Sequence, residues 1–282
     1  MSTIDQFESV FRSALRPSYQ QSYLPLVNLL LISDLGDEEA SQYLIEVEKF
    51  FTDASVPPKI THLAKEKSVD LDNLLSEIDR LSPDLIITHR HLHSSQANNI
   101  YTLGDHIEVL TQITSVPILL FPHHQSWRKD QFSPPDRIMV LSDQLSDNPT
   151  LVDAAVSVLS TPGHLLLAHV EDEATFEYYL KIIAKLPELD TELAREQIKE
   201  QLLKEAELFT EAITKSFQDG KTEIITSSYV SMGHPLKKYV SLVKENQIDL
   251  VVIQGKDEEQ VAILGMSYAL AVELNELPLL IL

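Results

Sequence analysis

The chain has 282 residues, 44% of them apolar, and a formal net charge of −21 at pH 7. Such an acidic surface repels phosphate backbones and anionic lipids, which argues against nucleic-acid-binding and membrane-surface functions. The sequence contains no cysteine, which excludes disulfides, thiolate metal sites and thiol nucleophiles.

Localisation is predicted from the same features. The N-terminal segment includes Asp5 and Glu8 and has neither a basic stretch nor a long apolar run, so we expect no secretory signal. The apolar stretches elsewhere are all shorter than the roughly 20 residues that span a bilayer. We therefore expect a cytoplasmic protein with no membrane contact and no nucleic-acid partner.

In chain order, the first half begins with an expected amphipathic helix whose apolar positions are Phe7, Val10, Phe11 and Ala14. A strand over 26–33 and a helix over 38–51 follow. Further apolar runs predict strands around Ile60, over 84–88 and over 118–121.

A linker is expected over 125–135, where Trp127, Lys129 and two prolines lie close together. In the second half, strands are predicted over 137–142, 164–170, 223–226, 249–254 and 278–282. Helices between them are predicted to begin at Pro149, Glu177, Pro235 and Gly265, the second of these in two pieces broken near Pro187. Strands that alternate with helices predict a parallel, doubly wound sheet.

The two halves repeat one pattern. Residues 84–88 read Asp-Leu-Ile-Ile-Thr, and residues 249–253 read Asp-Leu-Val-Val-Ile. Leu103-Gly104 matches Leu264-Gly265, and each glycine precedes a proline by the same interval (117 − 104 and 278 − 265). Several matched offsets of this kind indicate a duplication.

The first copy is shorter than the second, and two alignments explain this. We prefer the alignment in which its first strand is missing, so that 26–33 is the second strand and Ile60 matches Ile225. The alternative matches residues 32–34 with residues 141–143 and deletes an inner strand instead. Either way we predict three segments: a first domain over 1–124, N-terminally shortened in the preferred alignment, the linker over 125–135, and a second domain over 136–282.

The second half resembles the universal stress protein family over nearly its whole length. The resemblance rests on the order and spacing of motifs at 137–143, 165–170, 233–236, 249–255, 264–265 and 277–282. The first half resembles the same family from about residue 24 to residue 121.

This resemblance implies an α/β fold of two tandem Rossmann-like units with parallel sheets in the strand order 3-2-1-4-5. It also implies a pseudo-twofold arrangement in which the last strands, 117–121 and 278–282, meet. The family is linked to stress survival and signalling, and some members bind ATP or another adenine nucleotide.

Nucleotide-binding members carry a Gly-x2-Gly-x9-Gly-Ser/Thr loop after the fourth strand, because glycines let the backbone approach phosphates. By resemblance, the candidate nucleotide-binding residues are Asp143, Val170, Gly255, Gly265 and Ser267.

The loop departs from the family pattern in both halves. Glu258 replaces the second glycine, Met266 replaces the Ser or Thr, and acidic residues 257–259 repel phosphate. In the first half Arg90 and His93 replace the first two glycines, and only Gly104 is retained. We therefore expect no cofactor and no tight ATP binding, with ATP in the second half as the alternative that the resemblance leaves open.

Histidines suggest one further chemistry. His89, His91 and His93 alternate, and alternate side chains of an extended segment share a face. With His106 they could bind Zn²⁺. We favour the alternative that they belong to a polar loop at a strand end, exposed or hydrogen-bonded. Elsewhere we expect His123-His124 to be solvated and His169 to be a satisfied core residue.

The charged helix over 192–217 carries an apolar stripe. Its positions are Leu202, Leu203, Ala206, Phe209 and Ile213. We expect this stripe to pack on the sheet, although such a helix could instead contribute to a partner-binding groove.

Together these features predict a non-catalytic stress-response or signalling protein that acts through protein contacts and has degenerate ligand sites. No Gly-x-Ser-x-Gly elbow is present, so we assign no catalytic residue. The alternatives are an adenine-nucleotide sensor that uses the second half, and a metal-responsive module that uses the His89–His93 loop. We expect a protein partner or self-association, as a monomeric pseudo-dimer or a homodimer.

Overall fold

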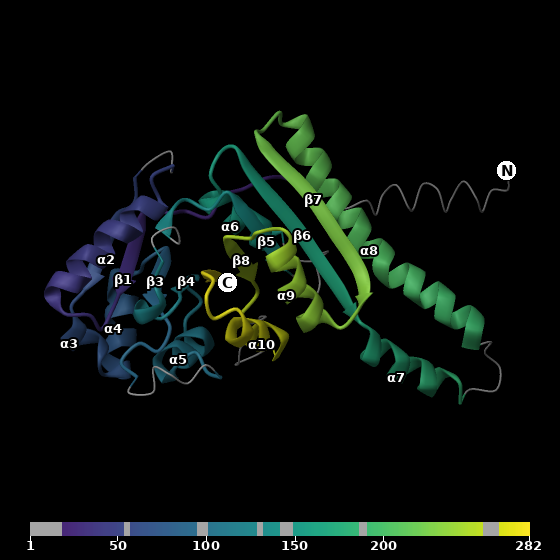
Figure 1. The fold of residues 1–282 in the computed structure, drawn as a ribbon, viewed down its shortest axis with the longest axis horizontal. Helices are drawn as coiled ribbons and strands as arrows, with labels where there is room; N and C mark the ends of the chain where they lie inside the picture. Colours follow the sequence, from purple (N-terminus) through teal and green to yellow (C-terminus); the bar gives the residue numbers. More distant parts are fainter. Residues whose placement is uncertain are drawn as a thin grey trace.

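The computed structural model describes residues 19–53, 57–94, 101–128, 132–141, 149–185, 191–255 and 265–282. Within these ranges, nine strands form one sheet in the order β2-β1-β3-β4-β9-β8-β5-β6-β7 (Figure 1). The predicted N-terminal helix around Phe7 lies outside the described residues. None of the helices in the described ranges combines the length and apolar content needed to cross a membrane.

The strands divide into two parallel sets. The first set comprises β1 (Asn28–Ile32), β2 (Lys59–Leu63), β3 (Leu85–His89) and β4 (Ile118–Phe121). The second set comprises β5 (Arg137–Leu141), β6 (Gly163–Asp172), β7 (Ile224–Gly233), β8 (Leu250–Ile253) and β9 (Leu279–Ile281). The second set follows the order 3-2-1-4-5 that the resemblance implied.

Helices cover both faces of the sheet. One apolar core includes residues of α2 (Asp37–Phe50), α6 (Thr150–Val158) and α8 (Thr191–Asp219). The other includes residues of α4 (Leu71–Leu81), α5 (Asp105–Ile113), α9 (Pro235–Glu245) and α10 (Gly265–Glu273). The short α3 (Lys65–Ser68), η1 (His124–Ser126) and α7 (Glu173–Ile183) complete the described elements. Burial on both faces explains the unbroken aliphatic runs of β3, β4 and β8.

The two sets meet at one antiparallel seam. Ile118, Leu119 and Leu120 of β4 pair with Ile281, Leu280 and Leu279 of β9. The predicted meeting of the last strands of the two halves is therefore confirmed. This pairing removes two apolar sheet edges from solvent.

A carboxylate supports the start of the first strand in each half. Asp84 Oδ2 accepts the N–H of Val27 at 3.0 Å and that of Asn28 at 2.8 Å. Asp249 Oδ2 accepts the N–H of Arg137 at 3.0 Å and that of Asp136 at 3.3 Å. Asn28 and Arg137 are thus equivalent positions.

The preferred alignment, in which the first half lacks its first strand, is wrong. β1 lies between β2 and β3, just as β5 lies between β6 and β8, so β1 is the first strand of its half. The match of Ile60 with Ile225 is also wrong, because Ile60 pairs with Leu29 of the first strand whereas Ile225 pairs with His164 of the second. Apolar patterning did not reveal this, since it does not specify a strand's neighbours.

The predicted linker is partly integrated into the core. Trp127 packs against it, and Phe132 is buried. The Trp127 ring centroid lies 4.4 Å from that of Tyr43 on α2. The described part of this segment is therefore more than an exposed tether.

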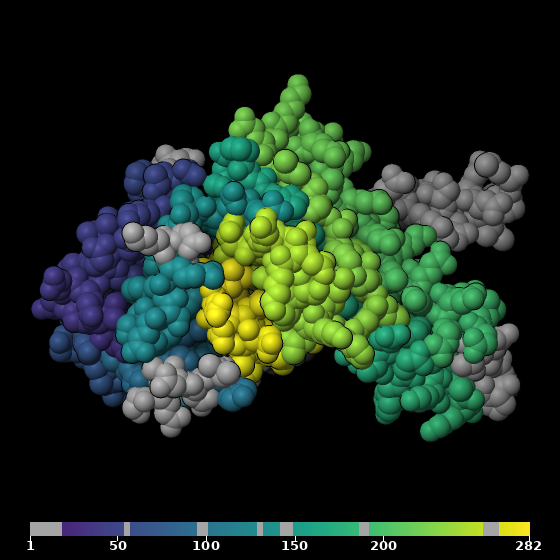
Figure 2. Space-filling view, in the orientation of Figure 1, coloured from purple at the N-terminus to yellow at the C-terminus, as the bar shows by residue number. Residues whose placement is uncertain are grey.

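The helix α8 over 191–219 packs on the sheet along only part of its length. Ala206, Phe209 and Ile213 are buried, so the predicted packing of the apolar stripe is confirmed for its C-terminal part. The N-terminal part of α8 and all of α7 project beyond the sheet as a separate lobe (Figures 1 and 2).

We predict that the seam is energetically coupled. Leu119→Ala and Leu280→Ala should each lower the free energy of unfolding by about 2–5 kcal/mol, because both side chains are fully buried. The double variant should deviate from additivity by about 0.5–3 kcal/mol in urea denaturation, since the two residues are register partners.

The control pairs Leu280→Ala with Leu167→Ala on β6, three strands or about 14 Å away. This pair should be additive within about 0.5 kcal/mol. Equal additivity for both pairs would contradict coupling across the seam.

Candidate functional site

Open parallel α/β sheets bind ligands outside the carboxyl ends of their strands, at the point where the strand order reverses. In the second half this point lies between β5 and β8. Of the residues predicted there, Val170, Gly255, Gly265 and Ser267 are described, whereas Asp143 lies outside the described residues.

Val170 has its main-chain donor already engaged. The residue is buried on β6, and its N–H donates to the hydroxyl of Tyr239 at 2.9 Å. Tyr239 belongs to α9 and is itself buried. A ligand at this position would have to compete with an internal hydrogen bond.

A glycine is needed at position 255 because Ile281 and Leu282 approach its backbone closely. Its N–H donates to the Leu282 carbonyl at 2.6 Å. A Cβ at this position would lie 2.7 Å from Ile281 Cγ2 and 3.0 Å from the Leu282 carbonyl oxygen. The glycine therefore has a packing role against the end of β9.

Gly265 differs from Gly255. It begins α10, and no described atom lies within 4 Å of the position that its Cβ would take. Ser267, two residues later, is buried. The structure therefore separates the two retained motif glycines into one that packs tightly and one that does not.

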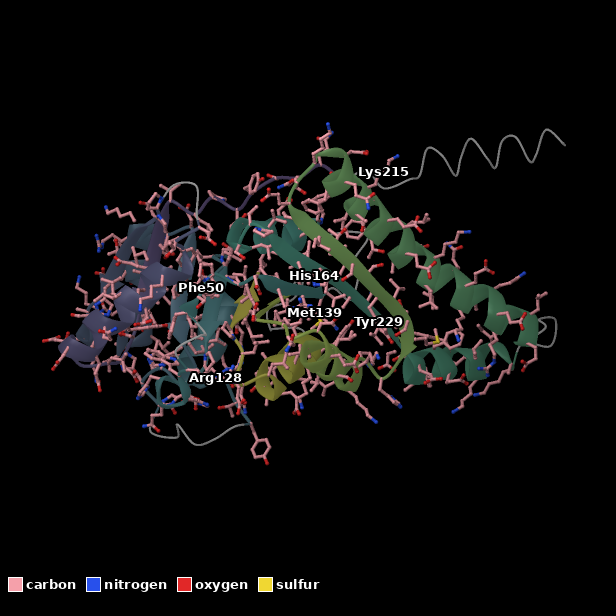
Figure 3. The ribbon with its side chains drawn as sticks, turned by 45° about the horizontal axis from the view of Figure 1, so that its top comes forward. Phe50, Arg128, Met139, His164, Lys215 and Tyr229 are labelled. Carbon is pink, nitrogen blue, oxygen red and sulfur yellow. The ribbon has the colours of Figure 1, made fainter. Side chains whose placement is uncertain are left out.

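A pocket adjoins Val170 at the carboxyl ends of β6 and β7. Its volume is about 240 Å³, and its lining includes Val170, Tyr229, His234 and Lys238. Lys238 Nζ lies 4.6 Å from the centroid of the Tyr229 ring, which is labelled in Figure 3. The sequence motif at 233–236 marked this region but did not predict a pocket.

In the first half, Asp34 takes the position that Asp143 has in the second (28 + 6 and 137 + 6), which supports the alternative alignment. Asp34 Oδ2 accepts the N–H of His93 at 2.8 Å, and Oδ1 lies 3.1 Å from His89 Nε2. Burial favours the neutral acid, but the contacts with His89 and His93 outweigh it and hold the pKa of Asp34 well below its ordinary value.

Packing within the protein also involves the loop that follows β3 in the first half. Arg90 is buried, donates from Nη2 to the Leu274 carbonyl at 3.1 Å, and has its pKa lowered to about 10 by burial. Gly104 has φ +95°, and a Cβ there would lie 2.8 Å from the backbone Cα of His91. This loop therefore serves contacts within the protein.

The predicted shared face of His89, His91 and His93 is wrong. β3 ends at His89, and the chain then turns, with φ values of 59° at His91 and 56° at His93. His93 Nε2 instead contacts Ser68 Oγ at 2.8 Å, and His106 Nε2 contacts the Val69 carbonyl at 3.0 Å. The favoured alternative, a hydrogen-bonded histidine in a loop at the strand end, is confirmed for His93, whereas His106 lies on α5.

The prediction that His123 and His124 are solvated is also wrong. Both are half-buried, their ring centroids are 4.1 Å apart, and the His124 ring lies 5.5 Å from that of His89. Burial, followed by the neighbouring imidazoles, lowers the pKa of His123 to about 4. His169 meets its prediction, since it is buried with Nε2 3.0 Å from Glu171 Oε1.

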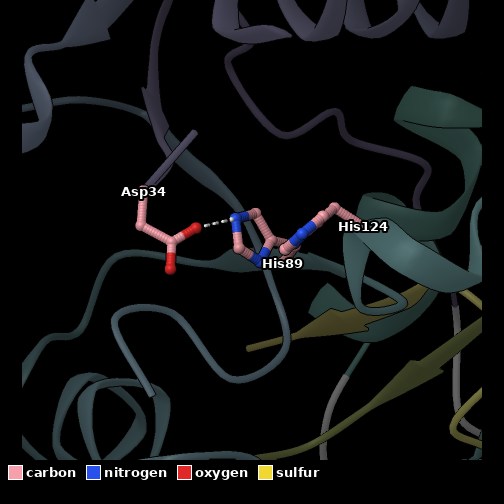
Figure 4. A group of neighbouring side chains, drawn as sticks. All are labelled: Asp34, His89 and His124. Carbon is pink, nitrogen blue, oxygen red and sulfur yellow. Dashed lines mark ion pairs between the residues drawn. The ribbon is translucent and has the colours of Figure 1, made fainter. Parts of the chain in front are cut away.

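Asp34, His89 and His124 form a group that the sequence reasoning did not assemble. Each lies at or just beyond the carboxyl end of one of three strands that are adjacent in the sheet (Figure 4). The available signal was a histidine pair directly after the fourth strand and an aspartate directly after the first.

The fold is similar to that of solved universal stress proteins. A universal stress protein from Archaeoglobus fulgidus aligns with 92% of this chain and 97% of its own, at 14% identity and a TM-score of 0.48. A putative universal stress protein from Pseudomonas aeruginosa aligns with 100% of this chain and 88% of its own, at 12% identity and a TM-score of 0.46. The hypothetical protein MJ0577 covers 52% of this chain with 95% of its own, at 14% identity and a TM-score of 0.39.

No protein-family model matches the sequence, and no curated protein matches it. Similarity at these levels carries no information on ligands. The strand pairing of this chain itself establishes its architecture.

We predict that the two retained motif glycines respond differently to a methyl group. Gly255→Ala should lower the free energy of unfolding by about 1–3 kcal/mol, because the new Cβ overlaps the end of β9. Gly265→Ala should be neutral or slightly stabilising, since its position is open and alanine favours a helix. Chemical denaturation of the two variants checks this, and equal losses would contradict the packing role of Gly255.

Proposed function

We propose that this protein is a universal-stress-protein-like signalling or stress-response protein that acts through protein contacts and holds no nucleotide after β8. The proposal rests most on Gly255, the first glycine of the motif, whose N–H is bonded to the chain end and whose Cα packs against it. Under this proposal the chain comprises units over 1–124 and 136–282, joined by 125–135.

Three further features support the absence of a nucleotide. The Val170 N–H donates to the Tyr239 hydroxyl, and this hydrogen bond would have to break before the N–H could contact a nucleotide base. The loop sequence carries carboxylates at 257–259, which repel a triphosphate. In the first half, the bulky side chain of Arg90 stands where the motif has glycine and is buried in the protein.

The lobe formed by α7 and the start of α8 supports a role in protein contacts. It projects from the body of the molecule (Figure 2) and exposes Tyr178, Tyr179, Ile182 and Leu193. The guanidinium of Arg195 on α8 binds both carboxylate oxygens of Glu177 on α7, which ties the two helices together. Exposed aromatic side chains on such a supported surface are typical of protein interfaces.

A titration with ATP–Mg²⁺ tests the nucleotide part of the proposal. Isothermal calorimetry of the full chain should give no dissociation constant in the micromolar range, because the backbone donors at Val170 and Gly255 already have partners. A micromolar isotherm that disappears in Gly265→Glu would overturn this part, since no atom of the described residues lies within 4 Å of the Cβ position and the residue follows the loop in sequence.

Site-specific photo-crosslinking tests the contact part. A benzophenone side chain at Tyr178, which is 61% exposed, should give a discrete crosslinked product in cells of the source organism. The same group at Tyr23, which is 64% exposed and lies before β1, outside the lobe, is the matched control and should give none. Crosslinking of the purified protein by itself distinguishes self-association from another partner, because only self-association gives a product there. Equal products at both positions would contradict a specific contact through the lobe.

A further inference from the structure

The group of Asp34, His89 and His124 is unused by the proposed function. Asp34 follows β1, His89 is the last residue of β3, and His124 begins η1 after β4. These three strands are neighbours in the sheet, so residues far apart in the sequence converge at one edge. One nitrogen or oxygen atom of each side chain lies within 4.8 Å of those of the other two (Figure 4).

Each of these side chains has a buried atom without a hydrogen-bond partner in the described part of the chain. The atoms are Asp34 Oδ1, His89 Nε2 and His124 Nδ1. Buried polar atoms are almost always paired, because an unpaired one loses its hydration without compensation. Two of these atoms, Asp34 Oδ1 and His89 Nε2, face each other at 3.1 Å, so their pairing depends on a positive charge between them.

The hydrogen bonding of His89 shows why a positive charge is needed. Its Nδ1 lies 3.0 Å from the Arg90 carbonyl oxygen, which can only accept, so Nδ1 carries the proton. In the neutral ring, Nε2 then presents a lone pair to Asp34 Oδ1 at 3.1 Å. Two lone pairs at this distance repel, and no water fits between them. A cation, either a proton or a metal ion, is needed there.

The surroundings resemble the outer shell of a metal site. Metal-binding histidines commonly donate their second N–H to a backbone carbonyl, as His89 does to Arg90. The second oxygen of Asp34 is held by the N–H of His93. Trp127, whose indole N–H donates to the Pro122 carbonyl at 2.8 Å, has its ring 6.1 Å from that of His89. These contacts restrain the ligands.

We propose that Asp34, His89 and His124 bind one divalent transition-metal ion of the Zn²⁺ class. Two imidazoles and one carboxylate favour such ions over Mg²⁺ and Ca²⁺, which prefer all-oxygen sites. Zinc–ligand bonds of about 2.0–2.2 Å place tetrahedral ligand atoms roughly 3.3–3.5 Å apart, close to the 3.1 Å between Asp34 and His89. His124 supplies the third ligand atom, which lies within 4.8 Å of the other two, and a fourth coordination position would be left for water or another ligand.

Calorimetric titration of the untagged, chelator-stripped full chain with Zn²⁺ tests this site. The wild type should bind one ion per chain. Asp34→Asn and His124→Gln should each weaken binding by about 100-fold or more, because each removes a metal ligand. His164→Gln is the control, since His164 Nε2 already contacts Ser227 Oγ at 2.8 Å, and it should leave the affinity unchanged.

A second measurement reports on the ligands themselves. Co²⁺ should give visible absorption bands of a four- or five-coordinate ion in the wild type and in His164→Gln, and these bands should change or vanish in both ligand variants. Asp34→Asn preserves the size of the side chain, and His124 is only half-buried, so both variants should fold. Circular dichroism of the metal-free proteins checks this.

The proposal is overturned if the wild type shows no one-to-one site. It is equally overturned if Zn²⁺ binds at several weak sites that persist in both ligand variants, because the acidic surface alone would then account for binding. Neither result bears on the nucleotide titration or on crosslinking at Tyr178, so the failure of this site and the failure of the proposed function are distinguishable.

Discussion

The architecture depends on the antiparallel pairing of β4 with β9. Both strands are buried and apolar along their whole length, so each would be an apolar sheet edge if the other were removed. Their pairing turns two parallel sheets into one continuous sheet. Two side-chain contacts reinforce the seam: Arg90 donates to the Leu274 carbonyl, and the Tyr268 hydroxyl donates to Glu108 Oε1 at 2.7 Å. The two halves are therefore packed directly against each other along the β4–β9 seam.

The seam also explains the packing around Gly255 and Arg90. Gly255 contacts the residues that follow β9, and Arg90 reaches across the seam from the corresponding loop of the first half. Gly255 and Arg90 therefore serve the junction between the halves. Steric demand alone can retain a glycine, so its presence is weak support for a ligand.

The carboxyl edges of the two halves carry different side chains. In the first half, the carboxylate after the first strand is held among histidines from the ends of β3 and β4. In the second half, the equivalent edge carries a pocket beside Val170 with lysine and tyrosine in its lining. One topology thus places two unlike sets of side chains at the same edge of one sheet, which is where this fold presents functional groups.

The sequence by itself determined the α/β class, the alternation of strands and helices, the strand order of the second half and the meeting of the last strands. The class and the alternation follow from local signals, because strands buried on both faces require unbroken apolar runs and helices require their own period. The strand order and the meeting of the last strands were expected from the resemblance of the sequence motifs to the universal stress protein family. Only the tertiary structure decided that β1 pairs with β3, and that His89 meets Asp34 and His124 rather than His91 and His93. The physical reason is that an apolar run does not specify which strand lies beside it, and left-handed backbone at His91 and His93 turns the chain where an extended segment was expected.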